Sequence, residues 1–250
     1  HQQKSFFLGT NGWYNSPTGD TTCILIETKD SYIILDAGSG ISKLDGYLKK
    51  TKKTYLFLSH FHIDHIQGLH VLDKFEFPQG LTICCYEGGG TILNQIMCQP
   101  FTVALKDLPY PVTVRELEVG MNDGFPFKVT CGDMTHSSRC FGFRFGIEAK
   151  IITLCTDTGY CPQAIELAKD SDLLMAECAY KTGQVVESWP HLNPEIAAKL
   201  ARDAHVKKMV LMHFDAAKYP TFGHRAKAKM IARKIFKNTE VSKDGMIVKI

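Results

Sequence analysis

A cluster of three histidines and one aspartate within six residues constrains this chain more than any other feature. His60, His62, Asp64 and His65 directly follow the apolar run 55–58. Imidazole nitrogen and carboxylate oxygen are ligands that suit zinc and its first-row neighbours. On a helix His60 and His62 would point to different faces, and on a continuing strand His65 would oppose the other three. The pattern therefore predicts a metal-binding loop at the end of a strand, with a histidine-rich surface turn as the alternative.

Further side chains of the same kind fall at or near the ends of later predicted strands, namely His136, Asp157 and His213. We expect two ions, the first held by His60, His62 and His136 and the second by Asp64, His65 and His213, with Asp157 bridging them. Three protein ligands per ion leave a position for water, which is typical of a catalytic rather than a structural site. Two such divalent ions, zinc in the first place and manganese as the alternative, would lie about 3.5–4 Å apart and share a hydroxide.

Other candidate ligands have a different interpretation. Asp36 ends a predicted strand over 32–35, where it either orients a ligand histidine through the free ring nitrogen or caps a turn. The chain has nine cysteines, an odd number without CxxC spacing, which favours reduced thiols. Most of them lie inside apolar runs, so we expect the cysteines to fill the core and not to bind the two ions.

Length and composition favour one α/β domain over residues 1–250, because the chain has 250 residues and 44% hydrophobic content. The formal net charge of +3 suits an anionic substrate and is too small to predict nucleic-acid binding. The sequence has no apolar run long enough to span a membrane and no hydrophobic signal segment near its start, so we expect a cytoplasmic protein without a membrane partner. Monomer and homodimer both stay open.

The secondary-structure pattern alternates strands and helices. Strands are predicted over 112–117, 125–130, 141–145 and 151–156, and all four are assigned to a second sheet. The last helix is predicted over about 226–237, with Met230, Ile231 and Ile235 on its buried side. The apolar, proline-rich segment 99–111 cannot be regular structure, and it either flanks a substrate cleft or covers the core.

The ligand pattern resembles the metallo-β-lactamase superfamily over nearly the whole chain, since His60-x-His62-x-Asp64-His65 is followed in order by His136, Asp157 and His213. The resemblance implies a four-layer αβ/βα sandwich, with two mixed sheets flanked by helices and the metals at one edge. Three further segments, 8–10, 34–38 and 244–246, are similar to the phosphodiesterase branch, which includes ribonuclease Z and the cyclic phosphodiesterase of phosphonate breakdown.

His191 is the residue that favours one type of reaction over the others. In that branch a histidine at a helix start, about twenty residues before the last metal histidine, points into the site and assists the phosphate or the leaving group, and His191 matches this spacing before His213. The resemblance implies that a metal-bridging hydroxide attacks phosphorus, that Asp64 positions this nucleophile and that His191 donates a proton. Arg139, near His136, is either a phosphate contact or a surface arginine.

Two differences from that branch narrow the range of possible substrates. Ribonuclease Z has a long tRNA-gripping arm between the ligands that match His136 and Asp157, where this chain has only about twenty residues, which argues against tRNA. Cys23 alone cannot form the additional cysteine-rich zinc site of the phosphonate enzyme. We therefore expect a small phosphodiester or a related anionic substrate. The alternatives are hydrolysis of an ester, thioester or lactone, a non-catalytic metal-binding regulator, and a single-strand nuclease.

Overall fold

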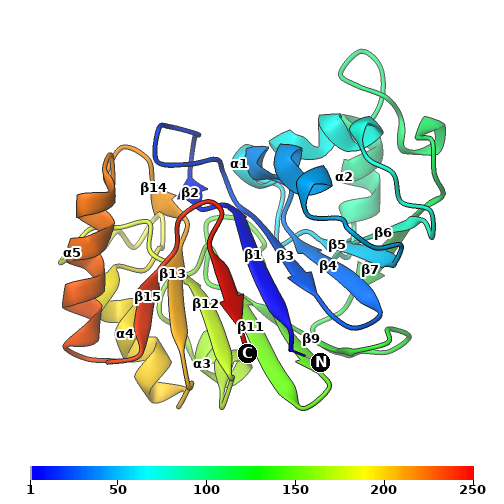
Figure 1. Ribbon diagram of the computed structural model, residues 1–250. Helices are drawn as coiled ribbons and strands as arrows, with labels where there is room; N and C mark the ends of the chain where they lie inside the picture. The colour runs from blue at the N-terminus through cyan, green and yellow to red at the C-terminus, as the bar shows by residue number, and fades with distance from the viewer. Residues whose placement is uncertain (1) are drawn as a thin grey trace.

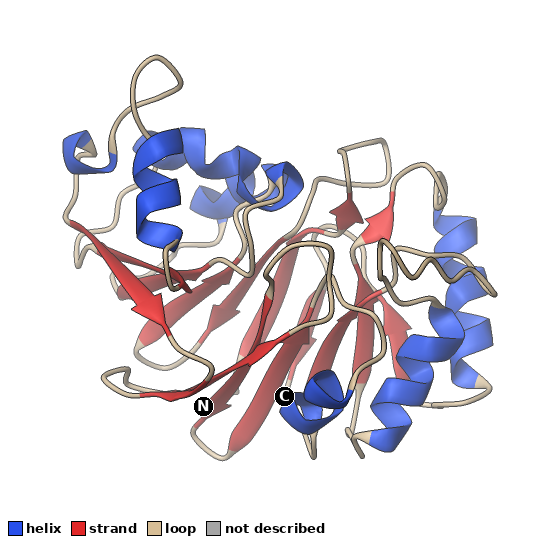
Figure 2. Ribbon diagram, turned by 180° about the vertical axis from the view of Figure 1, so that it is seen from behind, coloured by secondary structure: helices blue, strands red, loops and turns tan. Residues whose placement is uncertain are grey.

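The computed structural model describes residues 2–250 and has two mixed β-sheets stacked between outer layers of helices (Figures 1 and 2). This is the four-layer αβ/βα arrangement that the family resemblance implies. In Figure 1 the short strands β2 and β14 and the helix α1 lie at the same end of the sheets, and the two chain termini lie at the opposite end.

The first sheet has seven strands in the order β16-β1-β3-β4-β5-β6-β7. Their bounds in this order are Ile247–Lys249, Lys4–Gly9, Cys23–Glu27, Ser31–Leu35, Lys53–Phe57, Leu81–Tyr86 and Val112–Leu117. The pairs from β16 to β4 are antiparallel and the pairs from β4 to β7 are parallel. The parallel half brings the carboxyl ends of β4, β5 and β6 to one edge of the sheet.

The second sheet has seven strands in the order β15-β13-β12-β11-β10-β9-β8. Their bounds in this order are Thr239–Val241, Met209–Met212, Leu173–Glu177, Lys150–Cys155, Phe141–Ile147, Lys128–Asp133 and Gly120–Asn122. Here too one half is parallel, from β15 to β11, and the other is antiparallel. A separate pair, β2 (Asn11–Gly12) and β14 (Phe214–Asp215), joins the N-terminal loop to the residues just after β13.

Helices cover the outer faces of both sheets (Figure 2). The α-helices α1 to α5 span Ile63–Ile66, Gly89–Ile96, Pro162–Ala168, Pro194–Asp203 and Phe222–Arg233. The 3₁₀ helices η1 to η3 span Ser39–Gly46, Gln67–Lys74 and Leu105–Asp107. Helix α4 begins as predicted, because the Asn193 side chain accepts the Ile196 N–H at 2.9 Å and Pro194 takes the first helical position. Among residues 2–250, no helix has the length and apolar character that crossing a membrane requires.

The core lies in three layers. The middle layer packs the facing sides of the two sheets together, with Phe7 and Phe57 from the first sheet and Phe143 and Phe145 from the second. Each outer layer lies between one sheet and its helices. Eight of the nine cysteines are buried and Cys98 is half-buried, and all are free thiols, which agrees with the predicted core-filling role.

The predicted place of the strand 112–117 is wrong. Strand β7 belongs to the first sheet, where it pairs in parallel with β6 from Leu81–Val112 to Tyr86–Leu117. Composition marks a strand but not its partner, and the strand just before it in the chain is the partner here. The predicted strand 125–130 also lies three residues too early, since β9 spans Lys128–Asp133, and the short β8 was not predicted.

The predicted buried face of the last helix is also wrong. Helix α5 begins four residues earlier than predicted, and Met230 is 66% exposed. The buried positions are Arg225, Ala228 and Ala232, which share a face at helical spacing. Ala228 and Ala232 lie in the same core layer as the alanines of α4, whereas Met230 and Ile235 are exposed and Ile231 is half-buried.

The segment 99–111 covers the core. This was one of its two interpretations, the other being that it flanks a substrate cleft. Leu105, Leu108 and Tyr110 are buried in the outer layer of the first sheet, and η3 is the one turn of regular structure assigned within the segment. The Tyr110 hydroxyl donates to the Leu72 carbonyl at 2.5 Å, which fixes the segment against η2.

Candidate metal centre

The histidine loop follows β5 at the carboxyl edge of the first sheet. The Leu58 N–H donates to the Cys84 carbonyl at 2.8 Å, so the chain stays beside β6 for one residue after the strand ends. The single helical turn α1 then begins after His62, and the His65 N–H donates to the His62 carbonyl at 2.9 Å. This turn changes the direction of the chain, so that Asp64 and His65 belong to a different group of candidate ligands from His60 and His62.

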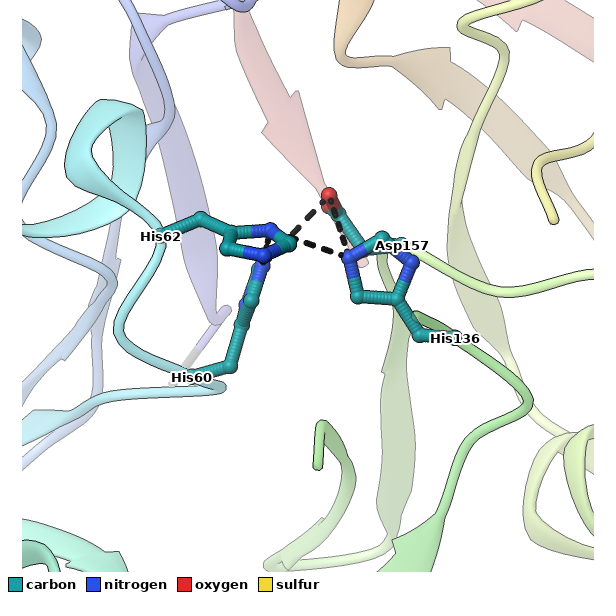
Figure 3. Close-up of side chains that lie close together, drawn as sticks. All are labelled: His60, His62, His136 and Asp157. Atoms are coloured by element: carbon teal, nitrogen blue, oxygen red, sulfur yellow. Dashed lines mark hydrogen bonds and ion pairs between the residues drawn. The ribbon is translucent and has the colours of Figure 1, made fainter. Parts of the chain in front are cut away.

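The first group of convergent atoms comes from both sheets (Figure 3). His62 Nδ1 lies 3.0 Å from His60 Nε2 and 3.1 Å from His136 Nε2. Asp157 Oδ2 lies 3.6 Å from His60 Nε2 and from His136 Nε2. These four side chains can hold a metal ion. Three imidazoles and one carboxylate are a ligand set that zinc accepts.

The second group lies directly beside the first. His65 Nε2 lies 3.1 Å from His213 Nε2, and Asp64 Oδ2 lies 3.3 Å from His213 Nε2. Asp157 Oδ1 lies 3.1 Å from His65 Nε2 and 3.3 Å from His213 Nε2. Asp157 thus presents one oxygen to each group. The structure brings all seven predicted ligands together, in the two predicted sets and with Asp157 between them.

Asp36 orients two of these histidines, His65 by a direct contact and His60 through Ser59. Its fully buried carboxylate lies 2.7 Å from His65 Nδ1 and accepts both the N–H and the hydroxyl of Ser59 at 2.7 Å. Ser59 Oγ in turn lies 2.9 Å from His60 Nδ1. Because Nδ1 of His60 and His65 is occupied, the Nε2 lone pairs are directed into the two groups. Of its two interpretations, Asp36 therefore has the first: it orients a predicted ligand histidine, His65.

Backbone strain is concentrated at the centre. Seven non-glycine residues among residues 2–250 have positive φ, and four of them, Trp13, Asp36, Asp157 and His213, belong to the centre or its rim. Such a conformation costs on the order of 1 kcal/mol or more per residue, and it persists where surrounding contacts require it. The positive φ values at these four residues are therefore consistent with a backbone held in place by the contacts of the centre.

The electrostatics fit a cation. Burial lowers the pKa of His60, His62 and His136, in the case of His136 to about 4, which keeps these imidazoles neutral and able to donate a lone pair. Burial also opposes the charged form of His65, but the carboxylates of Asp157, Asp64 and Asp36 outweigh it and raise its pKa well above the usual value. One half of the centre therefore offers neutral nitrogen donors and the other half stabilises positive charge.

His191 lies against both groups. Its ring centroid is 5.2 Å from that of His136 and 5.8 Å from that of His213. His191 Nδ1 lies 2.5 Å from Oε1 of Glu177, a fully buried carboxylate that also accepts the N–H groups of Thr158 and Ala179. Burial lowers the pKa of His191, but the Glu177 carboxylate outweighs burial and brings the pKa to about 9. The Glu177 carboxylate therefore favours the imidazolium form of His191.

A cavity of about 530 Å³ opens onto the centre. Its lining includes His62, Asp64, Asp157, His191 and His213. Arg139 lies outside the cavity lining among the described residues, 3.6 Å from Asp133 and against the rings of Tyr86 and Phe141, so the surface interpretation of Arg139 holds. Lys218 supplies a cationic side chain to the lining, and its Nζ lies 2.8 Å from Asp215 Oδ2.

Sequence reasoning missed Glu177, Lys218 and the two tryptophans at the cavity, Trp13 and Trp189. A signal for Glu177 was available, since a carboxylate that ends an otherwise apolar, fully buried strand needs a partner. Trp13 had no local signal, because its contact with the centre is its backbone N–H, which donates to Asp64 Oδ2 at 2.9 Å across 51 positions of the sequence.

Two stacked mixed sheets with a histidine and aspartate centre at one edge define a class, the metal-dependent hydrolases of the αβ/βα sandwich fold. Residues 32–214 match the family described as the Beta-lactamase superfamily domain, and the chain belongs to that metallo-β-lactamase superfamily. The chain is 25% identical over 254 residues to the probable metallo-hydrolase YhfI of Bacillus subtilis (strain 168), covering 98% of each chain. It is 26% identical to the ribonuclease Z of a Synechocystis strain, covering 98% of this chain and 93% of the relative.

Solved structures show the same fold. The crystal structure of YhfI from Bacillus subtilis superposes with a TM-score of 0.84 at 21% identity and covers 100% of both chains. A diphosphatase of the PhnP family superposes with a TM-score of 0.75 at 15% identity, covering 99% of this chain and 98% of that one. The match to the family model confirms the predicted superfamily, and these structures confirm the predicted fold.

Proposed function

We propose that the protein is a dinuclear metal-dependent phosphodiesterase. The observation that carries the proposal is the His191–Glu177 pair, which places a cationic proton donor in the cavity beside the predicted ligands. An alkoxide leaving phosphorus needs protonation more than a carbonyl addition does, so a preformed imidazolium favours phosphodiesters over carboxylic esters, thioesters and lactones.

Two divalent ions, zinc or manganese, would be held by His60, His62, His136, Asp64, His65 and His213 with Asp157 between them. When bound, they would supply charge neutralisation at the phosphate and a water of lowered pKa. The donor set fits them, because seven lone-pair donors converge in a buried place where the carboxylates favour positive charge.

Asp64 positions the attacking water in this proposal. His65 and His213 outweigh burial and lower the pKa of Asp64, so the group is a carboxylate at any working pH. Its Oδ2 is fixed by the Trp13 N–H at 2.9 Å and faces the cavity. A fixed acceptor at this point can take a hydrogen bond from water and align its lone pair with phosphorus.

His191 then acts as the general acid. The Nδ1–H group donates a hydrogen bond to the Glu177 carboxylate, which fixes the ring, and the Nε2–H group is the proton available to the substrate. With a pKa of about 9, the group is charged at pH 7 and can protonate a departing ester oxygen or hold a phosphate oxygen.

A small anionic substrate suits the cavity. Its volume of about 530 Å³ lies within the range of small-molecule sites. Ribonuclease Z and the PhnP-family diphosphatase, two proteins to which this chain is similar, are named for phosphate chemistry, and this supports a phosphodiester as the substrate class.

The test is His191→Ala, assayed on phosphodiesters with poor and good leaving groups and on a thioester and a lactone. We expect kcat to fall by roughly 10²–10⁴ on alkyl phosphodiesters and by less on p-nitrophenyl esters, with metal content unchanged. The matched control is His70→Ala, because His70 is an exposed histidine outside the cavity lining. Turnover of the lactone or thioester but of no phosphodiester would overturn the proposal.

A further inference from the structure

The only two tryptophans of the chain, Trp13 and Trp189, both line the cavity of the candidate metal centre. Trp13 is 64% exposed and Trp189 is 48% exposed. Tryptophan is highly buried on average in folded proteins, so two large exposed rings at one cavity need a reason. Neither ring belongs to the three core layers, so filling the hydrophobic core does not explain them.

Trp13 is held rigidly in spite of its exposure. Its backbone has a φ of 73°, and its N–H donates to Asp64 Oδ2 at 2.9 Å. The neighbouring strand β2 pairs with β14, directly after His213. The ring is thus anchored through the backbone to a predicted ligand, while the side chain stays free to contact a molecule in the cavity.

Trp189 is anchored on the other group of ligands. Its ring stacks on His62 with centroids 5.5 Å apart and an interplanar angle of 11°, and it meets His136 edge-on at 6.0 Å. Its carbonyl accepts a hydrogen bond from the Tyr180 hydroxyl. This ring is therefore also preorganised next to the centre.

The cavity consequently has two chemical zones. One zone is lined by four predicted ligands and His191, and with ions bound it would suit an anion; the other zone is lined by Trp13, Trp189 and Ile63, the last 70% exposed. Preorganised aromatic rings bind flat π-systems at low entropic cost, and stacking of a nucleic-acid base on them is tolerant of base identity.

We infer that the substrate is a phosphodiester in which one ester group bears a flat aromatic ring, with the ring held at Trp13 and Trp189 and the phosphate at the centre. The inference rests on the proposed function for its reaction and on the aromatic zone for its ligand class. A nucleobase and a simple aryl group share this chemistry, and the test distinguishes them.

Turnover is tested with two esters that differ by a single group, the methyl ester of adenosine 5′-monophosphate and the methyl ester of ribose 5-phosphate, followed by ³¹P NMR with zinc-loaded protein. We expect KM to be about 5-fold to 150-fold lower for the adenosine ester, the range that stacking of one base supports. Methyl phenyl phosphate is the aryl arm. A KM as low as that of the adenosine ester would assign the site to any flat ring, and a KM as high as that of the ribose ester would assign it to nucleobases.

Binding is tested without turnover. Adenosine 5′-monophosphate should quench the intrinsic fluorescence of the zinc-loaded protein and ribose 5-phosphate should not. Trp13→Phe and Trp189→Phe each leave a single tryptophan, and both variants should respond to the adenosine ligand.

The variant Trp13→Leu keeps the backbone N–H to Asp64 and removes the flat ring. We expect the preference of this variant for the adenosine ester over the ribose ester, measured as the ratio of the two KM values, to fall toward one, with a metal content that matches wild type. Phe101→Leu is the control, because Phe101 is 73% exposed and lies outside the cavity lining.

The outcomes separate the inference from the proposed function. Equal KM values for the two esters with no change in Trp13→Leu would overturn the inference while the phosphodiesterase stands. Quenching by the adenosine ligand with no cleavage of any ester would overturn the phosphodiesterase while the ligand class stands. Fluorescence that depends on protein concentration and not on ligand would mean that the tryptophans cover a second copy of the chain, which would also overturn the inference.

Discussion

Replacing Glu177 by glutamine tests the acid at the centre without touching a predicted metal ligand. Burial lowers the pKa of His191, and the Glu177 carboxylate is the main group that outweighs burial and brings the pKa to about 9. Its removal should return the pKa toward the ordinary 6.5. A raised pKa means that the acid is charged below about pH 9 in wild type and loses its proton as pH rises through that value.

The size of the effect follows from these two pKa values. At pH 8, about nine tenths of His191 is protonated when the pKa is about 9, and about 3% is protonated when the pKa is 6.5. With these two pKa values the loss in kcat on an alkyl phosphodiester is on the order of 30-fold at pH 8, and it shrinks as the pH falls toward 6. Two bound cations would lower both alkaline limits alike, so the separation between the limits is the quantity to measure.

The assay is the pH profile of kcat for wild type and Glu177→Gln on one ester with an alkyl and one with a p-nitrophenyl leaving group. The variant also weakens one buried hydrogen bond, to Thr158 or Ala179, at a cost of about 1–3 kcal/mol in unfolding, so its Tm sets the assay temperature. Glu166→Gln, at an exposed position outside the cavity lining, is the matched control. Identical alkaline limits in the two proteins would refute the reasoning, and so would equal losses on both leaving groups.

Three further substitutions test the geometry of the centre. Gly12→Ala should weaken binding of the ion held by His213, because a Cβ would lie 2.6 Å from Cε1 of that ring; zinc titration checks this, with Gly46→Ala as the control since nothing lies within 4 Å there. Asp36→Asn removes the carboxylate that orients a buried ligand histidine, and the zinc Kd should rise roughly 10- to 100-fold; an unchanged Kd would reject the orienting role. Cys140→Ala should leave the metal content unchanged, although Sγ lies 3.6 Å from His60 Nδ1, because that nitrogen faces away from the predicted ion; a lost ion would make the thiol a ligand.

The ligand set could be predicted because it obeys a local rule. The histidine loop follows β5, Asp157 follows β11 and His213 follows β13, so these ligands come after strands of parallel pairs, and the carboxyl ends of such strands gather at one edge. His136 is the exception, because it follows β9, whose pairings are antiparallel. Metal-ligating side chains at strand ends could therefore be recognised one strand at a time, without knowing which strands are neighbours.

Other features depend on pairings that the sequence does not encode locally. Strand β7 was assigned to the wrong sheet, since its composition suits either edge. The buried face of α5 was wrong because alanines, not Met230, contact the neighbouring helix. The role of Glu177 was not predicted, because its partner His191 lies fourteen positions later in the sequence.

The number of metal ions per chain tests the central claim most directly. We predict that metal-replete wild type holds two transition-metal ions per chain by mass spectrometry, that His60→Ala holds one, and that Asp157→Ala binds both more weakly, because Asp157 presents an oxygen to each group. Fewer than about one ion per chain in the wild type, or the same content in all three proteins, would contradict a dinuclear centre built from these residues.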